Sequence, residues 1–274
     1  MKNGLEQVDL FFFNGVRLTI SAITLLLFAW NERRRGILPK PDVTWRHLIT
    51  YSAMIGALYQ VLFLLGVGKT TAGNTALIIA TVPMWTALFA RVFLREKLHF
   101  VSWCGLFVSL TGTIIVAVQK GDVTLGTQSS LGNLMVLCAA LLWATGTVYS
   151  RPLLTKISPV QLAASSATLA LPVHLLLAIP FFPANLPELR SIGLVTIIIY
   201  SGVFSSGLSQ PMWNYGVRHA GAAHAAIVQN LVPIVAITAA WFTRNEQPTI
   251  AQVVGGLLIL GGLATMRMGR SMMN

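Results

Sequence analysis

The sequence predicts an all-α membrane protein of nine transmembrane helices. Of its 274 residues, 55% are hydrophobic and only 10% are charged, whereas a soluble domain carries roughly a quarter of charged residues. The apolar residues also fall in runs of about twenty, the length that crosses a hydrocarbon core about 30 Å thick. The mean hydropathy of +0.71 agrees with a chain that lies largely in a bilayer.

The apolar runs follow one another with short connections that are polar or contain Gly or Pro. Their predicted bounds are Leu10–Trp30, His47–Val67, Thr71–Leu94, Leu98–Val118, Leu131–Ser150, Pro159–Phe182, Ser191–Val217, Ala222–Thr243 and Thr249–Met268. No connection is long enough for a soluble domain, so we expect a single helical bundle.

The formal net charge of +11 is better explained by membrane topology than by nucleic-acid binding, because Lys and Arg lie between the apolar runs. One set of alternate loops, which includes Arg33–Arg35 and the C-terminal Arg270, holds most of these basic residues. Since Lys and Arg accumulate in cytoplasmic loops, the C-terminus is expected in the cytoplasm.

The sequence indicates no catalytic residue, cofactor or metal site. Cys104 and Cys138 both lie inside apolar runs, which favours neither a disulfide framework nor a metal cluster. Every Asp and Glu lies outside the helix centres, which argues against proton coupling through a carboxylate. Glu96 and Glu246 end helices beside arginines and are interpreted as structural.

An offset of 150 residues, which brings Gln60 onto Gln210, reveals an internal repeat. The same offset aligns Val82-Pro83 with Val232-Pro233, Glu96 with Glu246, Gly105 with Gly255 and Gly112 with Gly262. Such a repeat dictates the architecture. We therefore predict one repeat over residues 1–120 and a second over residues 131–270.

The second repeat begins with the helix Leu131–Ser150, whose counterpart in the first repeat would precede Met1. The expected design is five plus five helices with the first helix missing from this sequence. Because five is odd, the two repeats have opposite topology. Inverted repeats of this kind build secondary transporters, with the binding site near the bilayer midplane.

Several segments resemble the EamA domain of the drug/metabolite transporter superfamily. They are Thr71–Ala76, Val82-Pro83, Leu94–Glu96, Gly105 and Gly112, with their equivalents Gly221-Ala222, Ala226, Val232-Pro233, Glu246, Gly255 and Gly262, together with Leu142–Gly146 and Val16–Leu18. The resemblance covers essentially the whole chain. It implies a ten-helix exporter of amino acids or other small metabolites in the bacterial inner membrane.

Two glutamines are the first candidates for a substrate site. Gln60 shares a helical face with Ser52, Gly56 and Phe63, and the repeat places Gly202, Ser206, Gln210 and Trp213 in the same pattern. An amide facing lipid without a partner is costly, so both glutamines should face protein or a watery cavity. We therefore expect both faces, with Phe63 beside Gln60 and with Ser206 and Trp213 beside Gln210, to line a substrate cavity. The alternative is that these small and polar residues pack helices together.

The remaining candidates are Arg17, Trp143, Asn74 and His224 as cavity-lining residues, and Pro83 and Pro233 as kinks or gates. Each has a structural alternative. Arg17 could form a buried structural pairing, Asn74 and His224 lie near helix starts where capping competes, and a proline can kink a helix without gating. His174 matches no metal-ligand spacing and is interpreted as a core histidine with satisfied hydrogen bonds.

The predicted function is transport, most readily export, of small neutral or zwitterionic metabolites such as amino acids, by alternating access between the two repeats. A membrane-embedded enzyme and a non-transporting membrane scaffold remain as alternatives. The expected partners are the small-molecule substrate and the lipid bilayer; nucleic acid is not expected, and a homodimer stays open.

Overall fold

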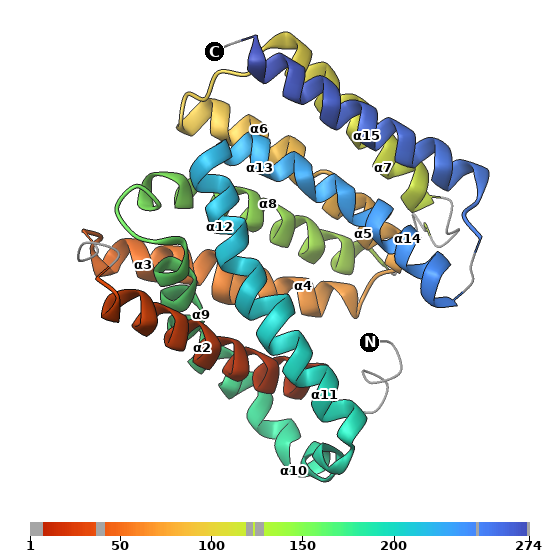
Figure 1. The fold of residues 1–274 in the computed structure, drawn as a ribbon. Coiled ribbons are helices and arrows are strands. Elements are labelled where there is room, and N and C mark those ends of the chain that lie inside the picture. Colours follow the sequence, from red (N-terminus) through yellow and green to blue (C-terminus); the bar gives the residue numbers. More distant parts are fainter. Residues whose placement is uncertain (1–7, 37–41, 119–122, 124–128, 245–246, 273–274) are drawn as a thin grey trace. The chain divides into compact units, whose positions relative to one another are not determined.

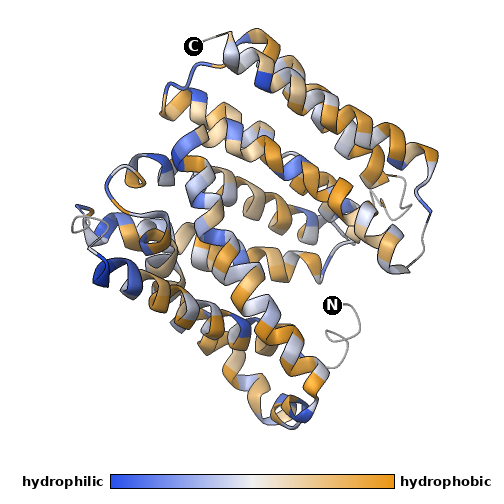
Figure 2. Cartoon of the chain, in the orientation of Figure 1, coloured by the Kyte–Doolittle hydropathy of each residue, from blue (hydrophilic) through white to orange (hydrophobic). Residues whose placement is uncertain are grey.

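The computed structural model describes residues 8–36, 42–118, 123, 129–244 and 247–272. Within these ranges the chain is helical, and nine helical segments are long and apolar enough to cross a membrane (Figure 1). This confirms the predicted fold class. Figure 2 shows hydrophobic residues along the long helices, with the most hydrophilic residues mainly at helix ends and connections.

The described helices fall in two series that correspond to the two repeats. The first series is α2 (Leu10–Arg34), α3 (Trp45–Tyr51), η1 (Ser52–Leu58), α4 (Tyr59–Val67), α5 (Ala72–Ala80), α6 (Val82–Phe93) and α7 (Phe100–Val118). The second is α8 (Ser130–Leu153), α9 (Pro159–Ala178), η3 (Ile179–Phe181), α10 (Phe182–Asn185), η4 (Leu186–Arg190), α11 (Ile192–Tyr200), η5 (Ser201–Leu208), α12 (Ser209–Ala220), α13 (Ala222–Ile227), η6 (Val228–Leu231), α14 (Val232–Arg244) and α15 (Ile250–Ser271).

Two predicted bounds differ from the structure for identifiable reasons. α2 continues past Trp30 to Arg34, because basic residues in the last turn interact favourably with the helix dipole. The run predicted to end at Phe182 leaves the α-helical conformation after Ala178. Prolines in the following short turns lack the N–H that a longer helix would need.

Each of the two glutamine-bearing helices contains a π-helical segment, η1 or η5, at equivalent positions of the repeat. The N–H that follows each segment bonds five residues back, from Tyr59 to Met54 and from Ser209 to Phe204. A π turn rotates the residues after it relative to an ideal α-helix. The single α-helical face assumed from Ser52 to Phe63 is therefore only an approximation.

The repeated prolines coincide with helix breaks, as expected for kinks. α5 ends at Ala80, and Pro83 lies in the first turn of α6. In the second repeat, the 3₁₀ turn η6 separates α13 from α14, which contains Pro233 in its first turn. The kinks are thus present in both repeats, while their use as gates stays a prediction.

The chain forms two compact units that each combine segments of both repeats. One unit comprises Met1–Val61 and Tyr149–His219, and the other comprises Leu62–Val148 and Ala220–Asn274. The predicted ranges 1–120 and 131–270 describe sequence repeats rather than these units.

In the first unit, two equivalent helix contacts depend on glycine. A Cβ on Gly56 of η1 would lie 2.7 Å from the Ala170 Cβ of α9, and one on Gly202 of η5 would lie 2.8 Å from the Arg17 carbonyl oxygen of α2. The repeat offset exchanges α2 with α9 and η1 with η5, so the two helix pairs are equivalent. The glycines are not, because the offset pairs Gly56 with Ser206 and Gly202 with Ser52.

In the second unit, α7 and α15 cross through two glycine pairs. A Cβ on Gly105 would meet the Gly262 carbonyl oxygen at 2.5 Å, and one on Gly112 would meet the Gly255 carbonyl oxygen at 2.5 Å. The repeat equates Gly105 with Gly255 and Gly112 with Gly262, so it maps each pair onto the other. This exchange is the relation expected between inverted repeats.

Glu96 closes the start of a helix in the same unit. Its carboxylate accepts hydrogen bonds from the N–H groups of Ala222 (3.1 Å) and Ala223 (3.4 Å) at the beginning of α13. Gly221 precedes them with φ = 88°, a conformation that favours glycine. The structural interpretation of Glu96 is confirmed, while Glu246 lies outside the described residues.

The glycine crossing gives a test of the fold. Gly262→Ala should lower the free energy of unfolding by about 1–3 kcal/mol, because its methyl group would collide with α7 backbone at a packed contact. The measurement is thermal unfolding of the purified protein in detergent. Gly261→Ala, with nothing within 4 Å of the new Cβ, is the matched control and should be neutral or slightly stabilising. Equal melting temperatures for the two variants would contradict the close crossing.

Candidate functional site

The first unit contains an arginine surrounded by neutral hydrogen-bond acceptors. Arg17 lies within the apolar span Leu10–Arg34. Its Nη1 donates to Ser206 Oγ at 3.1 Å, and its Nη2 donates to Asn14 Oδ1 at 2.6 Å and to Gln60 Oε1 at 3.4 Å. A cation inside the membrane is costly unless protein dipoles replace its water, and these three acceptors do so. We call Asn14, Arg17, Gln60, His174 and Ser206 the arginine cluster.

The hydrogen bonds of Arg17 leave part of its guanidinium unsatisfied. The group carries five N–H donors and a full positive charge, and its Nε–H is buried without an acceptor. The three acceptors are uncharged. The cluster therefore solvates the cation without neutralising it, which gives it an affinity for an anion.

A directed chain of hydrogen bonds fixes the side of the cluster that faces α9. His174 Nε2 lies 2.7 Å from the Gly56 carbonyl oxygen, which can only accept, so Nε2 carries the proton. Because Arg17 can only donate, the Asn14 oxygen faces Arg17 and the Asn14 Nδ2 faces His174 Nδ1 at 3.3 Å. Nδ1 must then accept, and this geometry holds His174 as the neutral Nε2–H tautomer.

Local sequence explains how these groups meet. Asn14 and Arg17 are three residues apart on α2, a spacing that places side chains on one helix face. Gly56 lets η1 approach α9 closely enough for His174 to reach its carbonyl oxygen, and Gly202 holds η5 against α2 near Ser206. The packing of small residues therefore positions the polar groups.

Gln210 belongs to a second polar cluster in the same unit. Its Nε2 donates to the Tyr51 hydroxyl at 3.4 Å, and that hydroxyl donates to Asn214 Oδ1 at 3.2 Å. Asn214 Nδ2 in turn donates to the Pro159 carbonyl oxygen at 3.3 Å. Tyr51 and Asn214 are buried, whereas Gln210 is partly exposed.

The structure thus brings three of the predicted residues together: Arg17, Gln60 and Ser206. Gln210 joins a different hydrogen-bond cluster, so the two glutamines do not share one set of partners among the described residues. Trp213 follows Gln210 on α12 and is half-buried. The candidates that lie in the other unit are Phe63, Asn74, Pro83, Trp143, His224 and Pro233.

Asn74 lies in the first turn of α5 but does not cap it. Its N–H bonds the side chain of Thr71, the residue that caps α5. Its side-chain amide donates to Asn133 Oδ1 of α8 at 3.1 Å and to Thr70 Oγ1 at 3.3 Å. These bonds hold α5 against α8, so Asn74 acts in helix packing in this conformation.

Sequence reasoning missed four residues of the two clusters: Asn14, Tyr51, His174 and Asn214. A usable signal existed for Asn14, because an amide three residues from an arginine in an apolar run predicts a shared helix face. His174 was expected to be satisfied, and both its ring nitrogens are bonded. Its contact with the arginine cluster depends on how α9 packs against α2, which the sequence does not specify.

Comparisons with known proteins agree with this architecture. The model of the EamA-like transporter family matches residues 1–118 and 130–268. The chain is 25% identical over 264 residues to the uncharacterized transporter YoaV of Bacillus subtilis, covering 96% of this chain and 89% of that protein. It is 28% identical over 250 residues to a probable terminal-alkyne amino-acid exporter of Streptantibioticus cattleyicolor, covering 90% and 80%.

A solved crystal structure shares the fold. It superposes with a TM-score of 0.83 at 18% sequence identity, covering 100% of this chain and 92% of that chain. At this identity the likeness concerns the fold alone.

The hydrogen-bond chain through His174 can be tested by stability. His174→Leu should cost about 1–3 kcal/mol in the free energy of unfolding, because it leaves the buried Asn14 amide without its acceptor. Thermal unfolding in detergent measures the effect. Thr196→Val is the control, since the Thr196 hydroxyl bonds its own helix on an exposed face. A His174→Leu variant as stable as this control would refute the directed chain.

Proposed function

This chain belongs to the EamA-like transporter family, and we propose that it exports small zwitterionic metabolites of the amino-acid type, with Arg17 binding the substrate carboxylate. The observation that carries the proposal is a cation within a membrane span whose hydrogen-bond partners among the described residues are all neutral. A substrate carboxylate supplies the missing negative charge. Arginine binds carboxylates through paired, charge-assisted hydrogen bonds.

The donors of Arg17 suggest when the carboxylate binds. The Nε–H is buried in this conformation, so an acceptor reaches it only when neighbouring side chains move. Such movement is inherent in alternating access, which we propose occurs between the inverted repeats. Ser206 and Gln60 lie on helices of opposite repeats and both contact Arg17, so a change between the repeats alters the solvation of the guanidinium.

Two observations favour an amino-acid-like substrate over a cation or a large apolar molecule. The residues bonded to Arg17 are neutral and polar, and they provide no anionic group for a polycation. The relative from Streptantibioticus cattleyicolor is named a probable amino-acid exporter. The names of these relatives also favour transport over catalysis.

The cellular setting that we propose follows from charge and family. The distribution of Lys and Arg supports a C-terminus on the cytoplasmic side of a bacterial inner membrane. The small-molecule substrate and the lipid bilayer are then the immediate partners of the chain.

Arg17→Gln tests the role of the charge. In proteoliposomes, transport per folded molecule of a substrate amino acid should fall at least about tenfold, because a charge-assisted hydrogen bond contributes about 1.5–3 kcal/mol. Transport of the corresponding amine, which lacks the carboxylate, should be unchanged.

Arg190→Gln is the matched control for the loss of one positive charge, since Arg190 is exposed in the turn after α10. It should transport like the unmodified protein. If Arg17→Gln lowered amino-acid and amine transport by the same factor, Arg17 would not bind the carboxylate.

Asn14→Asp tests the same idea by supplying a fixed anion. One oxygen of the new carboxylate would lie where the Asn14 oxygen accepts from Arg17 at 2.6 Å, so an ion pair forms. The other oxygen would replace the amide that donates to His174 Nδ1, so transport is measured per folded molecule. Amino-acid transport should drop because the guanidinium is already neutralised. Asn214→Asp is the control. Its buried carboxylate would lie beside the Tyr51 hydroxyl and have no cation to pair with, so the folded yield should fall. Full transport by Asn14→Asp would contradict the proposal.

A further inference from the structure

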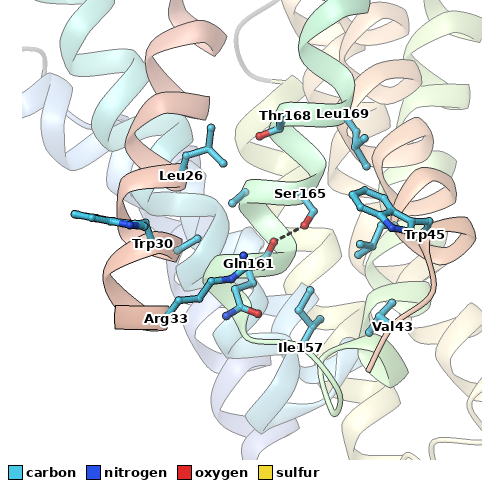
Figure 3. A pocket seen from close by; sticks show the side chains of 13 residues that line it. Leu26, Trp30, Arg33, Val43, Trp45, Ile157, Gln161, Ser165, Thr168 and Leu169 are labelled. Atoms are coloured by element: carbon cyan, nitrogen blue, oxygen red, sulfur yellow. Dashed lines mark hydrogen bonds between the residues drawn. The ribbon is translucent and has the colours of Figure 1, made fainter. Parts of the chain in front are cut away.

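A groove in the first unit lies apart from the arginine cluster and shares no residue with it. It has a volume of about 460 Å³ and lies between the C-terminal half of α2, the start of α3 and the N-terminal half of α9. Figure 3 shows Leu26, Trp30 and Arg33 on the α2 side and Val43 and Trp45 on the opposite side, with α9 between them. The transport site described above does not account for this groove.

The walls of the groove suit an acyl chain. Most lining residues are aliphatic or aromatic, and the wall from Leu26 to Arg33 extends about two helical turns, roughly 10 Å along the membrane normal for an untilted helix. Leu26, Trp30 and Trp45 are exposed although they are large and apolar. In a helix that spans a bilayer, such side chains face lipid.

Arg33 and Gln161 lie at one end of the groove, where a lipid headgroup would lie, while Ser165 and Thr168 follow along α9 toward the other end (Figure 3). Trp30 and Trp45 have the amphipathic character of residues at the membrane interface. Arg33 contributes a cation to the lining, and Figure 3 shows its side chain reaching from α2 toward Gln161 of α9. The neighbouring Arg34 instead stacks on the Trp30 ring, with its guanidinium carbon 4.3 Å from the ring centre.

Gln161 is the second observation that points to a ligand. Its side chain lines the groove and the residue is only 5% exposed. The hydrogen bonds found for Gln161 in the described chain involve its backbone: its N–H donates to Ser158 Oγ and its carbonyl oxygen accepts from Ser165. A buried amide without a protein partner requires a ligand or water to satisfy it.

We propose that this groove binds the phosphate headgroup and part of one acyl chain of an anionic phospholipid. Arg33 and the Gln161 amide donate to the phosphate, while Leu26 and the two tryptophans contact the glycerol and upper acyl region. Glu32 precedes Arg33 in the chain, but its carboxylate accepts a hydrogen bond from Ser158 Oγ at 2.6 Å and lines a different pocket, as does Asp42. Among the described residues that line the groove, Arg33 is the one that carries a charge, which favours a lipid with net negative charge over a zwitterionic one.

The test is native mass spectrometry of the full-length protein in detergent, titrated with palmitoyl-oleoyl phosphatidylglycerol or the corresponding phosphatidylcholine. One phosphatidylglycerol should bind at least about fivefold more tightly than phosphatidylcholine, because a basic residue near an anionic headgroup contributes about 1 kcal/mol. Arg33→Gln should abolish this preference. Gln161→Leu should weaken phosphatidylglycerol binding without loss of folded protein, since the Gln161 side-chain amide has no hydrogen-bond partner among the described residues.

Arg35→Gln is the matched control, because it removes the same charge from the same exposed run but does not line the groove. It should keep the preference for phosphatidylglycerol. If Arg33→Gln and Arg35→Gln reduced the preference for phosphatidylglycerol equally, the lipid would be attracted to the basic surface in general, and the proposed site would be wrong. Equal binding of both lipids would overturn it as well. Competition by millimolar inorganic phosphate or glycerol 3-phosphate would show that the groove takes a free phosphate instead of a lipid.

Discussion

The need to hold a guanidinium ion inside a lipid bilayer organises the first unit. Arg17 lies about two helical turns inside α2, so protein dipoles must replace its hydration. Asn14 comes from the same helix, Gln60 from the helix after η1 and Ser206 from η5. Three separate segments must therefore converge on one side chain, and the orientation of Asn14 and His174 follows from the donor that Arg17 presents.

Close helix packing is what makes this convergence geometrically feasible. Gly56 and Gly202 remove the side chains that would separate η1 from α9 and η5 from α2. In a membrane, where apolar contact between helices has little advantage over contact with lipid, small residues that let backbones approach supply much of the association energy. The glycine pairs of α7 and α15 meet the same requirement in the second unit. In the first unit, the helix packing and the hydrogen bonds of the arginine cluster thus depend on the same two glycines.

The sequence predicted the nine spans, the repeat and the family well, because these depend on run length, composition and coincidence at one offset. It also identified Arg17, Gln60 and Ser206, since a polar residue in an apolar run needs a polar environment. It did not predict that His174 would meet Asn14, because this contact depends on the packing of α9 against α2. Nor did it predict that Gln60 and Gln210 would join different clusters, since Gln60 contacts Arg17, and the repeat equivalent of Arg17 is Ala167. Whether Trp143 and His224 line a cavity stays a prediction.

The repeat conserves packing but not polarity, and this difference is informative. The offset that equates the glycine pairs of α7 and α15 places Ala164 opposite Asn14, Ala167 opposite Arg17 and Thr24 opposite His174. Two inverted copies of one scaffold can exchange conformations with similar energies, as alternating access requires. A substrate with a distinct charged end, however, needs a binding site that is not symmetric. The cation of Arg17, the amide of its partner Asn14 and the His174 imidazole that bonds Asn14 have no counterparts of the same kind in the other repeat. The arginine cluster therefore has the asymmetry that the proposed binding of a carboxylate in one orientation requires. Symmetry in the backbone and asymmetry in the side chains then serve two separate requirements of the same carrier.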